Sequence, residues 1–453
     1  MKTSKRVRAA AILAALFAPP LLAQSPIQDF SLSGTVGWSD NVRGEYVDQV
    51  SDTIVGVGLQ TRISQERRKF NFGLTADLQY LEYLDDTFDN EVTGLASFEG
   101  SLVLVPEILT FEVNDNFGQT QSAAFAPQTP ETRQNVNVFA AGPDIRLEMG
   151  DALVLLGSGR YMNERYEVTP ADNSRTLAQL GLYHEFSADS ALGILGQVSD
   201  VDYDDDTSGA YDFKRTEYLA RYRLAARRTA IILEGGQSRF SADDGTDRDE
   251  VLYRVSLARQ LTSRTSLTLA AGRELTDSGS LFVSTVDAME PQDGIGGSTI
   301  DDLGLGSTQL MGTGIVASVD SLIVQYARGA WRFSTPRTRA YVSADYRKER
   351  YIQGVSSDRD VNTLATGIER NLSPALRVGL DVAYYTRESL EEDDVVLRDL
   401  SIRLSTFWRV SRRVELSVAA ERANRSDSST GGGFDDNRVW ARLIWSPRGT
   451  AAD

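Results

Sequence analysis

The sequence has no cysteine and a single histidine, His184, among its 453 residues. Without thiols the chain forms no disulfide, and it has neither a cysteine nucleophile nor a thiolate zinc site. One histidine is also too few for a histidine-based metal cluster. These absences predict a protein without a metal site, without a cofactor and without the usual catalytic groups of an enzyme.

Long apolar runs are missing too, apart from one at the N-terminus. The chain begins with four basic residues by position 8, continues with an apolar run over 9–22, and has a small residue at Ala23. This order is typical of a secretory signal, so residues 1–23 are predicted to be cleaved. The alternative, an N-terminal membrane anchor, is less favoured because the run is short for a bilayer span.

Positive charge is scarce, since 47 basic side chains face 64 acidic ones. Removing residues 1–23 shifts the formal net charge from −17 to about −21, because that segment has four basic and no acidic side chains. Nucleic acid is therefore excluded as a partner, since phosphate backbones are bound by basic surfaces. After residue 23 only Lys69, Lys214 and Lys348 are lysines, and all other basic residues are arginines.

Apolar and polar residues alternate with period 2 through most of the chain. One face of the 373–388 segment carries Leu376, Val378, Leu380, Val382 and Tyr384, and the other carries Arg377, Gly379, Asp381 and Ala383. An antiparallel sheet with one apolar face must cover that face. No amphipathic helix or second sheet remains to cover it, so lipid is the simplest cover, with the polar face turned toward water.

The pattern therefore predicts an all-β fold: a transmembrane antiparallel up-and-down β-barrel of about 18–20 strands in the outer membrane of a Gram-negative bacterium. The barrel is expected over 30–445, after a short periplasmic segment at 24–29 and before a tail at 446–453. Tight turns alternate with longer acidic loops, which matches the short periplasmic turns and long extracellular loops of such barrels. An interfacial aromatic girdle is expected from Tyr80, Tyr83, Tyr384, Tyr385, Trp408 and Trp445.

Two features of the sequence bear on catalysis and on metal binding. His184 shares a face with Leu180, Leu182 and Phe186, which indicates an interfacial residue rather than a hydrolase base. Asp202, Asp204 and Asp206 have the spacing of calcium-loop ligands, but Thr207 and Phe213 stand where that loop needs Gly and Glu. Looser binding of divalent cations by the acidic loops, bridging to lipopolysaccharide phosphates, stays an alternative to a solvated surface.

The inward phase of the strands carries many arginines together with carboxylates and aromatic residues. One interpretation is a ladder of ion pairs that stiffens the wall, and the other is a lining that contacts a polar or anionic solute. The lumen-lining candidates are Arg221, Arg223, Arg254, Arg339, Arg377, Arg403, Arg442, Tyr341 and Trp440. The long Gly-rich segment 277–319 is expected to be a luminal constriction, a surface loop or an extra hairpin.

The start of the mature chain resembles the opening of the beta-barrel porin 2 family. The resemblance is carried by the glycine-spaced stretch from Phe30 to Val42, which runs into the pair Asp40-Asn41, and by the strand rhythm over nearly the whole mature chain. It implies an outer-membrane pore associated with exopolysaccharide export, served by periplasmic synthesis or export partners.

The leading hypothesis is thus a non-enzymatic outer-membrane channel for a polar solute, an exopolysaccharide above all. The alternatives are a general diffusion porin and a surface-binding or structural barrel that uses its acidic loops. The expected partners are outer-membrane lipid, lipopolysaccharide and the barrel-assembly machinery.

Overall fold

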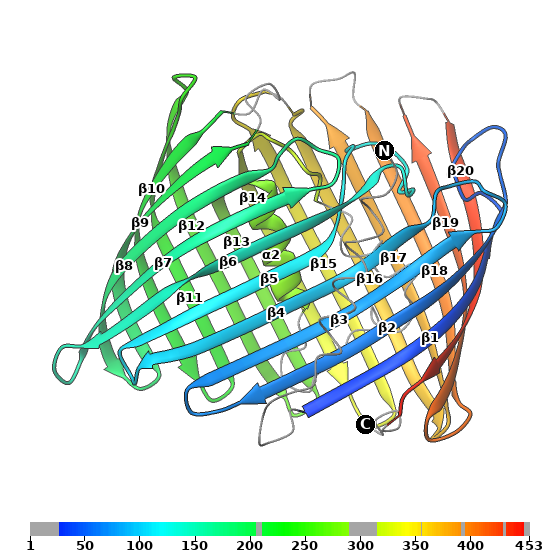
Figure 1. The fold of residues 1–453 in the computed structure, drawn as a ribbon, viewed down its shortest axis with the longest axis horizontal. Helices are drawn as coiled ribbons and strands as arrows, with labels where there is room; N and C mark the ends of the chain where they lie inside the picture. The colour runs from blue at the N-terminus through cyan, green and yellow to red at the C-terminus, as the bar shows by residue number, and fades with distance from the viewer. Residues whose placement is uncertain are drawn as a thin grey trace.

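The computed structural model describes residues 27–204, 211–289, 315–354, 356–390, 395–428 and 432–447. Its twenty antiparallel strands each pair with the next along the chain, and β20 pairs back with β1, so the sheet closes into a barrel (Figure 1). The first ten strands are β1 (Ile27–Ser39), β2 (Asp52–Glu66), β3 (Phe70–Tyr83), β4 (Glu91–Val105), β5 (Leu109–Gln121), β6 (Arg133–Glu148), β7 (Leu153–Tyr166), β8 (Asn173–Ser187), β9 (Ser190–Tyr203) and β10 (Phe213–Ala226). The others are β11 (Thr229–Ala242), β12 (Asp247–Thr262), β13 (Thr265–Thr276), β14 (Leu322–Ser334), β15 (Thr338–Tyr351), β16 (Arg359–Ser373), β17 (Leu376–Ser389), β18 (Val396–Arg409), β19 (Val414–Asp427) and β20 (Gly432–Trp445).

This architecture confirms the predicted fold class and strand number. One boundary was wrong: β1 begins at Ile27, inside the segment 24–29 that was expected to precede the barrel. Residues 27–29 extend β1 because they pair with Arg62, Ile63 and Ser64 of β2. The predicted signal segment 1–23 lies outside the described residues, as does the tail beyond 447.

The strands are long enough to cross a bilayer at a steep tilt. A 14-residue strand such as β7 measures about 46 Å at 3.3 Å per residue. Tilted by about 45°, it spans roughly 33 Å, close to the apolar thickness of a membrane. Short turns lie at one end of the barrel and long connections at the other (Figure 1).

Side chains alternate between an apolar outer face and a mixed inner face. Leu380 and Leu404 are 43% and 58% exposed on the outside, whereas Arg403, next to Leu404, is buried inside. Within the predicted girdle, Tyr80, Tyr384, Trp408 and Trp445 are exposed on the outer face.

Two predicted girdle residues point the other way. Tyr83 is buried, and its ring packs against the ring of Phe88 at 5.3 Å. Tyr385 lies under the guanidinium of Arg387 and lines an interior cavity. Both residues have odd numbers, and the odd-numbered side chains of β3 and β17 face inward. Their position near a strand end was therefore not enough to assign them to the girdle.

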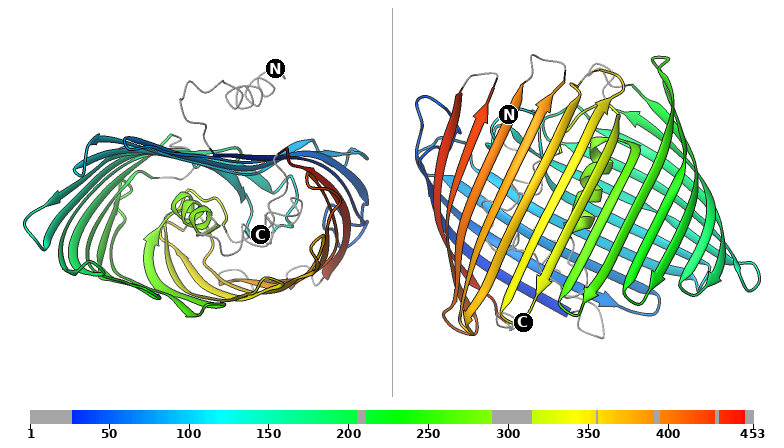
Figure 2. Two further views of the ribbon diagram at one scale, coloured as in Figure 1. Left: turned by 90° about the horizontal axis from the view of Figure 1, so that it is seen from below. Right: turned by 180° about the vertical axis from the view of Figure 1, so that it is seen from behind.

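The barrel is elongated in cross-section, and a helix, α2 (Ser278–Met289), lies inside it (Figure 2). No helix among the described residues is long and apolar enough to cross a membrane. Around α2, inward residues of β6–β13 such as Val136, Tyr183, Leu195 and Phe240 form an apolar cluster with Phe282 of the helix. The expected wet interior is therefore wrong for this part of the lumen, where side chains from facing walls and the insert exclude water.

Candidate functional site: the luminal insert and the charged wall

The insert after β13 begins with a capped helix. Asp277 is the N-cap of α2, since its carboxylate accepts the backbone N–H of Ser280 at 2.9 Å and the Ser280 hydroxyl at 3.1 Å. The Asp277 carbonyl also accepts the Leu281 N–H at 3.0 Å. A carboxylate at this position satisfies free amides and complements the positive end of the helix dipole.

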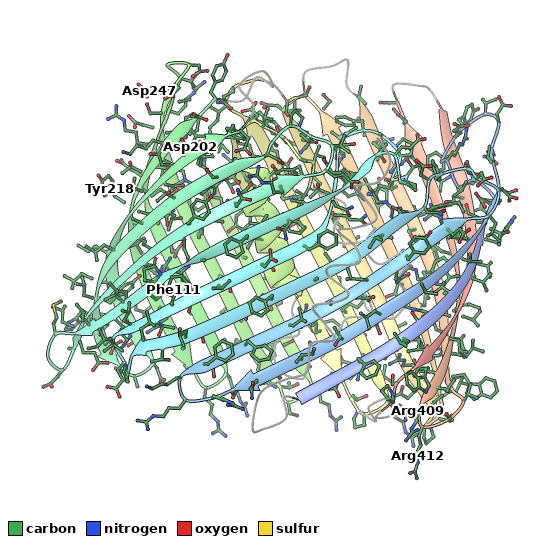
Figure 3. All side chains as sticks on the ribbon, in the orientation of Figure 1. Phe111, Asp202, Tyr218, Asp247, Arg409 and Arg412 are labelled. Carbon is green, nitrogen blue, oxygen red and sulfur yellow. The ribbon has the colours of Figure 1, made fainter. Side chains whose placement is uncertain are left out.

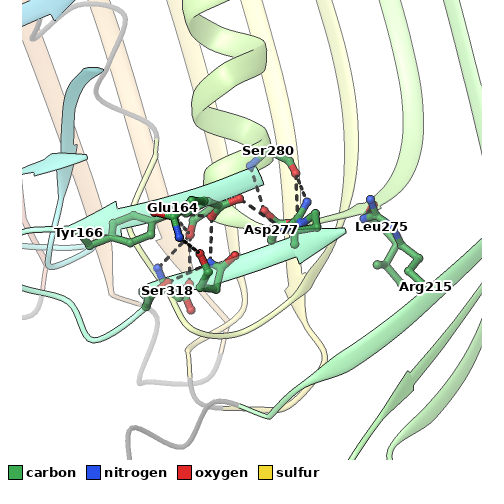
Figure 4. A network of polar contacts seen from close by, with 12 residues as sticks. Glu164, Tyr166, Arg215, Leu275, Asp277, Ser280 and Ser318 are labelled. Carbon is green, nitrogen blue, oxygen red and sulfur yellow. Dashed lines mark hydrogen bonds and ion pairs between the residues drawn. The ribbon is translucent and has the colours of Figure 1, made fainter. Parts of the chain in front are cut away.

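The same carboxylate anchors α2 to the barrel wall (Figure 4). Arg175 on β8 approaches Asp277 at 2.8 Å, Glu164 of β7 at 3.5 Å, and donates to the Ser280 hydroxyl at 2.9 Å. Arg215 on β10 donates to the Leu275 carbonyl at 2.8 Å, just before the helix. Removing one charge from such a buried set leaves its partners uncompensated, which costs about 3–5 kcal/mol.

The electrostatics of this anchor favour an ionised Asp277. Burial alone raises the pKa of its carboxyl, but the nearby charges of Arg175 and Arg215 outweigh burial and bring the pKa below its ordinary value of 3.8. The Asp277 carboxylate is therefore charged at neutral pH.

Close packing fixes how α2 meets the wall. A Cβ at Gly279 would lie 2.0 Å from Oε2 of Glu164, so any larger residue would force the helix or that carboxylate to move. Two strands away in the same part of the sheet, a Cβ at Gly118 of β5 would lie 2.9 Å from the ring of Phe282. The helix is thus packed closely against the β5–β8 part of the wall.

The chain returns to the wall along a second, separate path. Residue Gln121 at the end of β5 donates its N–H to the Ile315 carbonyl at 3.1 Å and accepts the Ala317 N–H at 2.9 Å. The Ser278 hydroxyl donates to the Ser318 carbonyl at 3.1 Å, which joins both ends of the insert. The described ends of the 277–319 segment are thus inside the barrel, which excludes a surface loop for these parts. Residues 290–314 lie outside the described residues, and a gating role stays a prediction.

A second insert was not foreseen from the sequence. The β5–β6 connection, residues 122–132, reaches across the interior to the opposite wall, where Arg425 of β19 donates to the Ala126 carbonyl at 3.1 Å. The guanidinium of Arg387 on β17 lies 5.9 Å from the ring of Phe125. The three alanines and two prolines in this loop gave no signal of a luminal path.

The lumen-lining candidates on β10–β12 form a ladder of ion pairs. Arg221 contacts both Glu234 and the Tyr183 hydroxyl. Glu234 also binds Arg254 at 2.9 Å, and Arg254 binds Glu274 of β13 at 2.5 Å.

Arg223 lies one inward position below Arg221 and is exposed. With Arg146 and Arg221 it lines a cavity of about 280 Å³.

The candidates on β15–β20 are paired as well, but far from the first group along the sheet. Arg339 and Arg377 share Glu369 at 3.7 and 3.4 Å. Arg403 binds Glu421 at 2.6 Å, and both are buried.

The remaining candidates on this wall complete the pattern. The Arg403 guanidinium lies 5.4 Å from the Trp440 ring, and Tyr341 donates to Asp381 at 3.1 Å. Arg442 is fully buried, 3.9 Å from Asp77. The candidates therefore line the wall in two groups and do not converge on one site, and contact with a solute stays a prediction.

His184 is exposed on the outer face, with its ring 4.9 Å from that of Phe186, as the interfacial interpretation requires. Among the described residues there is no group of three or more His, Cys, Asp or Glu side chains that could hold a metal ion. The Asp206 position of the rejected calcium loop lies outside those residues.

The pair Asp40-Asn41, part of the stretch that resembles the porin family, has a structural role. Asp40 accepts the backbone N–H and the side-chain amide of Asn437 on β20, both at 2.7 Å. Asn41 is fully buried and holds Glu45 of the β1–β2 loop through both of its side-chain atoms. The pair thus fastens this loop to the seam where β1 and β20 close the barrel.

No protein-family model and no curated protein matches the chain. Solved structures similar to it include a mutant of the ferric enterobactin receptor PfeA from Pseudomonas aeruginosa, at 10% identity and a TM-score of 0.46, covering 92% of this chain and 80% of that one. Another is the ferric citrate transporter FecA, at 8% and 0.41, covering 93% and 79%. Pseudomonas aeruginosa OccK2 (OpdF) has 11% identity and a TM-score of 0.40, covering 94% and 100%. At these values the similarities carry no argument about what this chain does.

Proposed function

We propose that this chain is an outer-membrane channel that passes a polar solute, an exopolysaccharide above all, through its lumen without catalysis. The observation that carries the proposal is the closed twenty-stranded barrel with an apolar outer face and an inner face of paired charges. Such an exterior is stable only in lipid, and a closed barrel is the one sheet that leaves no edge there. Export by a cleaved signal at 1–23 completes this proposal.

The insert supplies the constriction that a wide barrel needs. Barrels of 16–18 strands already enclose an aqueous channel, so an unfilled barrel of twenty strands would leak. Here α2 is anchored to β8 by a buried ion pair, while the β5–β6 loop crosses the interior to Arg425 on β19. A solute route must therefore run beside these two inserts or require one of them to move.

The polysaccharide is favoured by the family resemblance and by the chemistry of the β14–β20 wall. Planar guanidinium, carboxylate and aromatic groups lie there side by side, as in Arg377 over Phe407 at 4.2 Å and Tyr341 beside Asp381. Such groups bind hydroxyls and pack on the apolar faces of sugar rings.

The test compares secreted with periplasm-retained polysaccharide in a strain that lacks the gene, with and without complementation by the intact chain. Loss of secretion with polymer trapped in the periplasm supports an export pore. Unchanged secretion rejects the polysaccharide and leaves the general diffusion porin, which bilayer conductance with small solutes would reveal.

The surface-binding or structural barrel is favoured by one observation, the apolar cluster that fills the interior between β6 and β13. A barrel that only binds at its surface gives no conductance, and its ligand binding is abolished by replacing the acidic loops. A barrel that conducts, and whose conductance is unaffected by those loops, is not of this kind.

A further inference from the structure

The short turns of the barrel carry a one-sided excess of positive charge. Across all nine short turns the sequence has nine basic and three acidic residues. The three acids, Glu107, Asp151 and Asp189, occupy the consecutive turns from β4 to β9. The basic residues occupy the rest of the rim and are Arg67, Arg68, Lys69, Arg227, Arg228, Arg264, Arg337, Arg412 and Arg413. We call these nine residues the basic rim.

The connections at the other end have the opposite charge. Leaving out the two luminal inserts, 122–132 and 277–321, the sequence between the strand ends there has 19 acidic residues and one basic residue, Arg43. Figure 3 shows both ends, with Arg409 and Arg412 at the lower rim and Asp202 and Asp247 near the upper one. The barrel is therefore polarised along its axis, with the positive end on the periplasmic side if short turns face the periplasm.

The positive charge continues from the rim into the lumen. Arg332, Arg339, Arg377 and Arg409 occupy inward positions near the lower ends of β14, β15, β17 and β18, directly above the turns that hold Arg337, Arg412 and Arg413. The acidic residues of this part of the wall are fewer, and Glu369 is already shared by two arginines. A basic path thus leads from the rim onto the interior wall, in the part of the barrel opposite the apolar cluster.

Arginine suits anion capture on such a path. Its guanidinium is always charged and planar, and it binds carboxylate, phosphate or sulfate groups through two parallel hydrogen bonds. Exposed charges of one sign around a mouth also raise the local concentration of the opposite charge. A globular acidic protein could contact the rim but not the arginines inside, whereas a flexible chain can follow both.

We propose that the basic rim captures an anionic polymer at the periplasmic mouth and leads it onto the luminal arginines of β14–β18. This rests on the proposed export function and specifies its substrate as a polysaccharide that carries carboxylate, phosphate or sulfate groups. The acidic outer loops then repel the emerged polymer, which prevents it from binding again outside.

The experiment uses the intact chain in lipid nanodiscs. Binding of a fluorescent oligogalacturonate and of a neutral dextran of equal length is measured by anisotropy at 50 and 300 mM KCl. Two variants reverse rim charges, Arg412→Glu/Arg413→Glu and Arg227→Glu/Arg228→Glu, and Arg412→Lys/Arg413→Lys keeps the charge. The matched control, Arg43→Glu/Gln49→Glu, adds negative charge at exposed positions of the opposite end.

We expect the oligogalacturonate to bind and the dextran not to bind, with binding weakened at the higher salt because the Debye length shortens. Each charge reversal lowers the affinity by about tenfold, and the lysine variant, which keeps the charge but loses the two parallel hydrogen bonds, lowers it by about two- to threefold. The control changes the affinity by less than about twofold. Equal binding of dextran, or an equal effect of the control, overturns the proposal.

Two further outcomes separate this proposal from its alternatives. Rim variants that abolish secretion but leave oligogalacturonate binding intact indicate an acidic protein partner at the rim, and they overturn capture of a polymer. If the gene is required for secretion but only the neutral polymer binds, the export function is supported and the proposal of an anionic substrate is rejected. If secretion does not depend on the gene, the export function itself fails.

Discussion

Replacing Gly279 by alanine is expected to undock α2 from the wall. In a free helix this change is stabilising by up to about 1 kcal/mol, because alanine is the better helix former. In the barrel the new Cβ would lie 2.0 Å from Oε2 and 2.3 Å from Cδ of Glu164, a carboxylate that is almost fully buried. To reach an ordinary contact of 3.4 Å, helix and carboxylate must separate by roughly 1.4 Å.

Either way of relieving this contact breaks a buried interaction. Turning Glu164 away disrupts its contacts with Arg175 at 3.5 Å and Asn173 at 3.1 Å. Shifting the helix stretches the 2.8 Å pair between Asp277 and Arg175. Overpacking of this kind costs about 1–3 kcal/mol, and loss of a buried ionic partner about 3–5 kcal/mol. We take about 2–3 kcal/mol as the net cost to the docked state, which raises the undocked fraction by about 30- to 150-fold.

Hydrogen exchange measures the undocked fraction directly. The probes are the backbone N–H groups of Ser280 and Leu281, which both donate hydrogen bonds to Asp277. Their exchange in the Gly279→Ala protein is expected to be at least 30 times faster than in the unchanged protein. Gly235→Ala is the matched control, because a Cβ there meets nothing within 4 Å. Equal protection in all three proteins would refute the packing argument, and slower exchange in Gly279→Ala would show that helix propensity dominates.

Three further perturbations test this anchor and two other contacts of the barrel. The pKa of the Asp277 carboxyl is lowered in the folded chain, so the carboxylate's contribution to docking is present above about pH 4 and is lost as the pH falls below the ordinary pKa of 3.8. Hydrogen exchange of the Ser280 amide, corrected for its intrinsic rate, should become faster over that acid range in the unchanged protein and should not do so in Asp277→Asn. Arg403→Met leaves the buried Glu421 without its 2.6 Å partner and should lower the free energy of unfolding from vesicles by about 3 kcal/mol or more. Combining Arg403→Met with Glu421→Leu should recover most of that loss. If the losses of the two single variants simply add in the double variant, the two side chains do not act as a buried pair. His184→Ala should leave transport unchanged, since the ring lies outside the lumen beside Phe186, and a loss of transport with the barrel intact would reopen a chemical role.

The barrel was predictable because the alternation of apolar and polar residues in each strand depends on that strand alone. Leu380 and Asp381 alternate for reasons local to β17, and the tight turn before Leu376 needs no distant partner. What failed depends on contacts between distant strands. Tyr83 and Tyr385 have ordinary girdle chemistry, and only the register of the closed sheet shows that they point inward.

The interior was harder to predict than the wall for a related reason. A period-2 pattern assigns residues to two faces, but it does not show that Tyr183, Leu195 and Phe240 meet across the lumen as an apolar cluster. The helix α2 had a weak local signal, with Asp277 as N-cap before the apolar Leu281 and Phe282. Its anchor residues Glu164 and Arg175 lie more than 100 positions away, and nothing near them in the sequence marks them as partners.

The most direct measurement of the central claim is the conductance of this chain in planar lipid bilayers, with and without the insert. Thr276 pairs with Leu322, so residues 277–321 can be replaced by an Asn-Gly turn that continues the β13–β14 hairpin. An insert-gated channel for polar solutes predicts low or intermittent conductance for the intact chain and a larger, steady conductance for the shortened one. Absence of conductance in both proteins, with the barrel folded in each, would contradict a channel and favour a barrel that only binds.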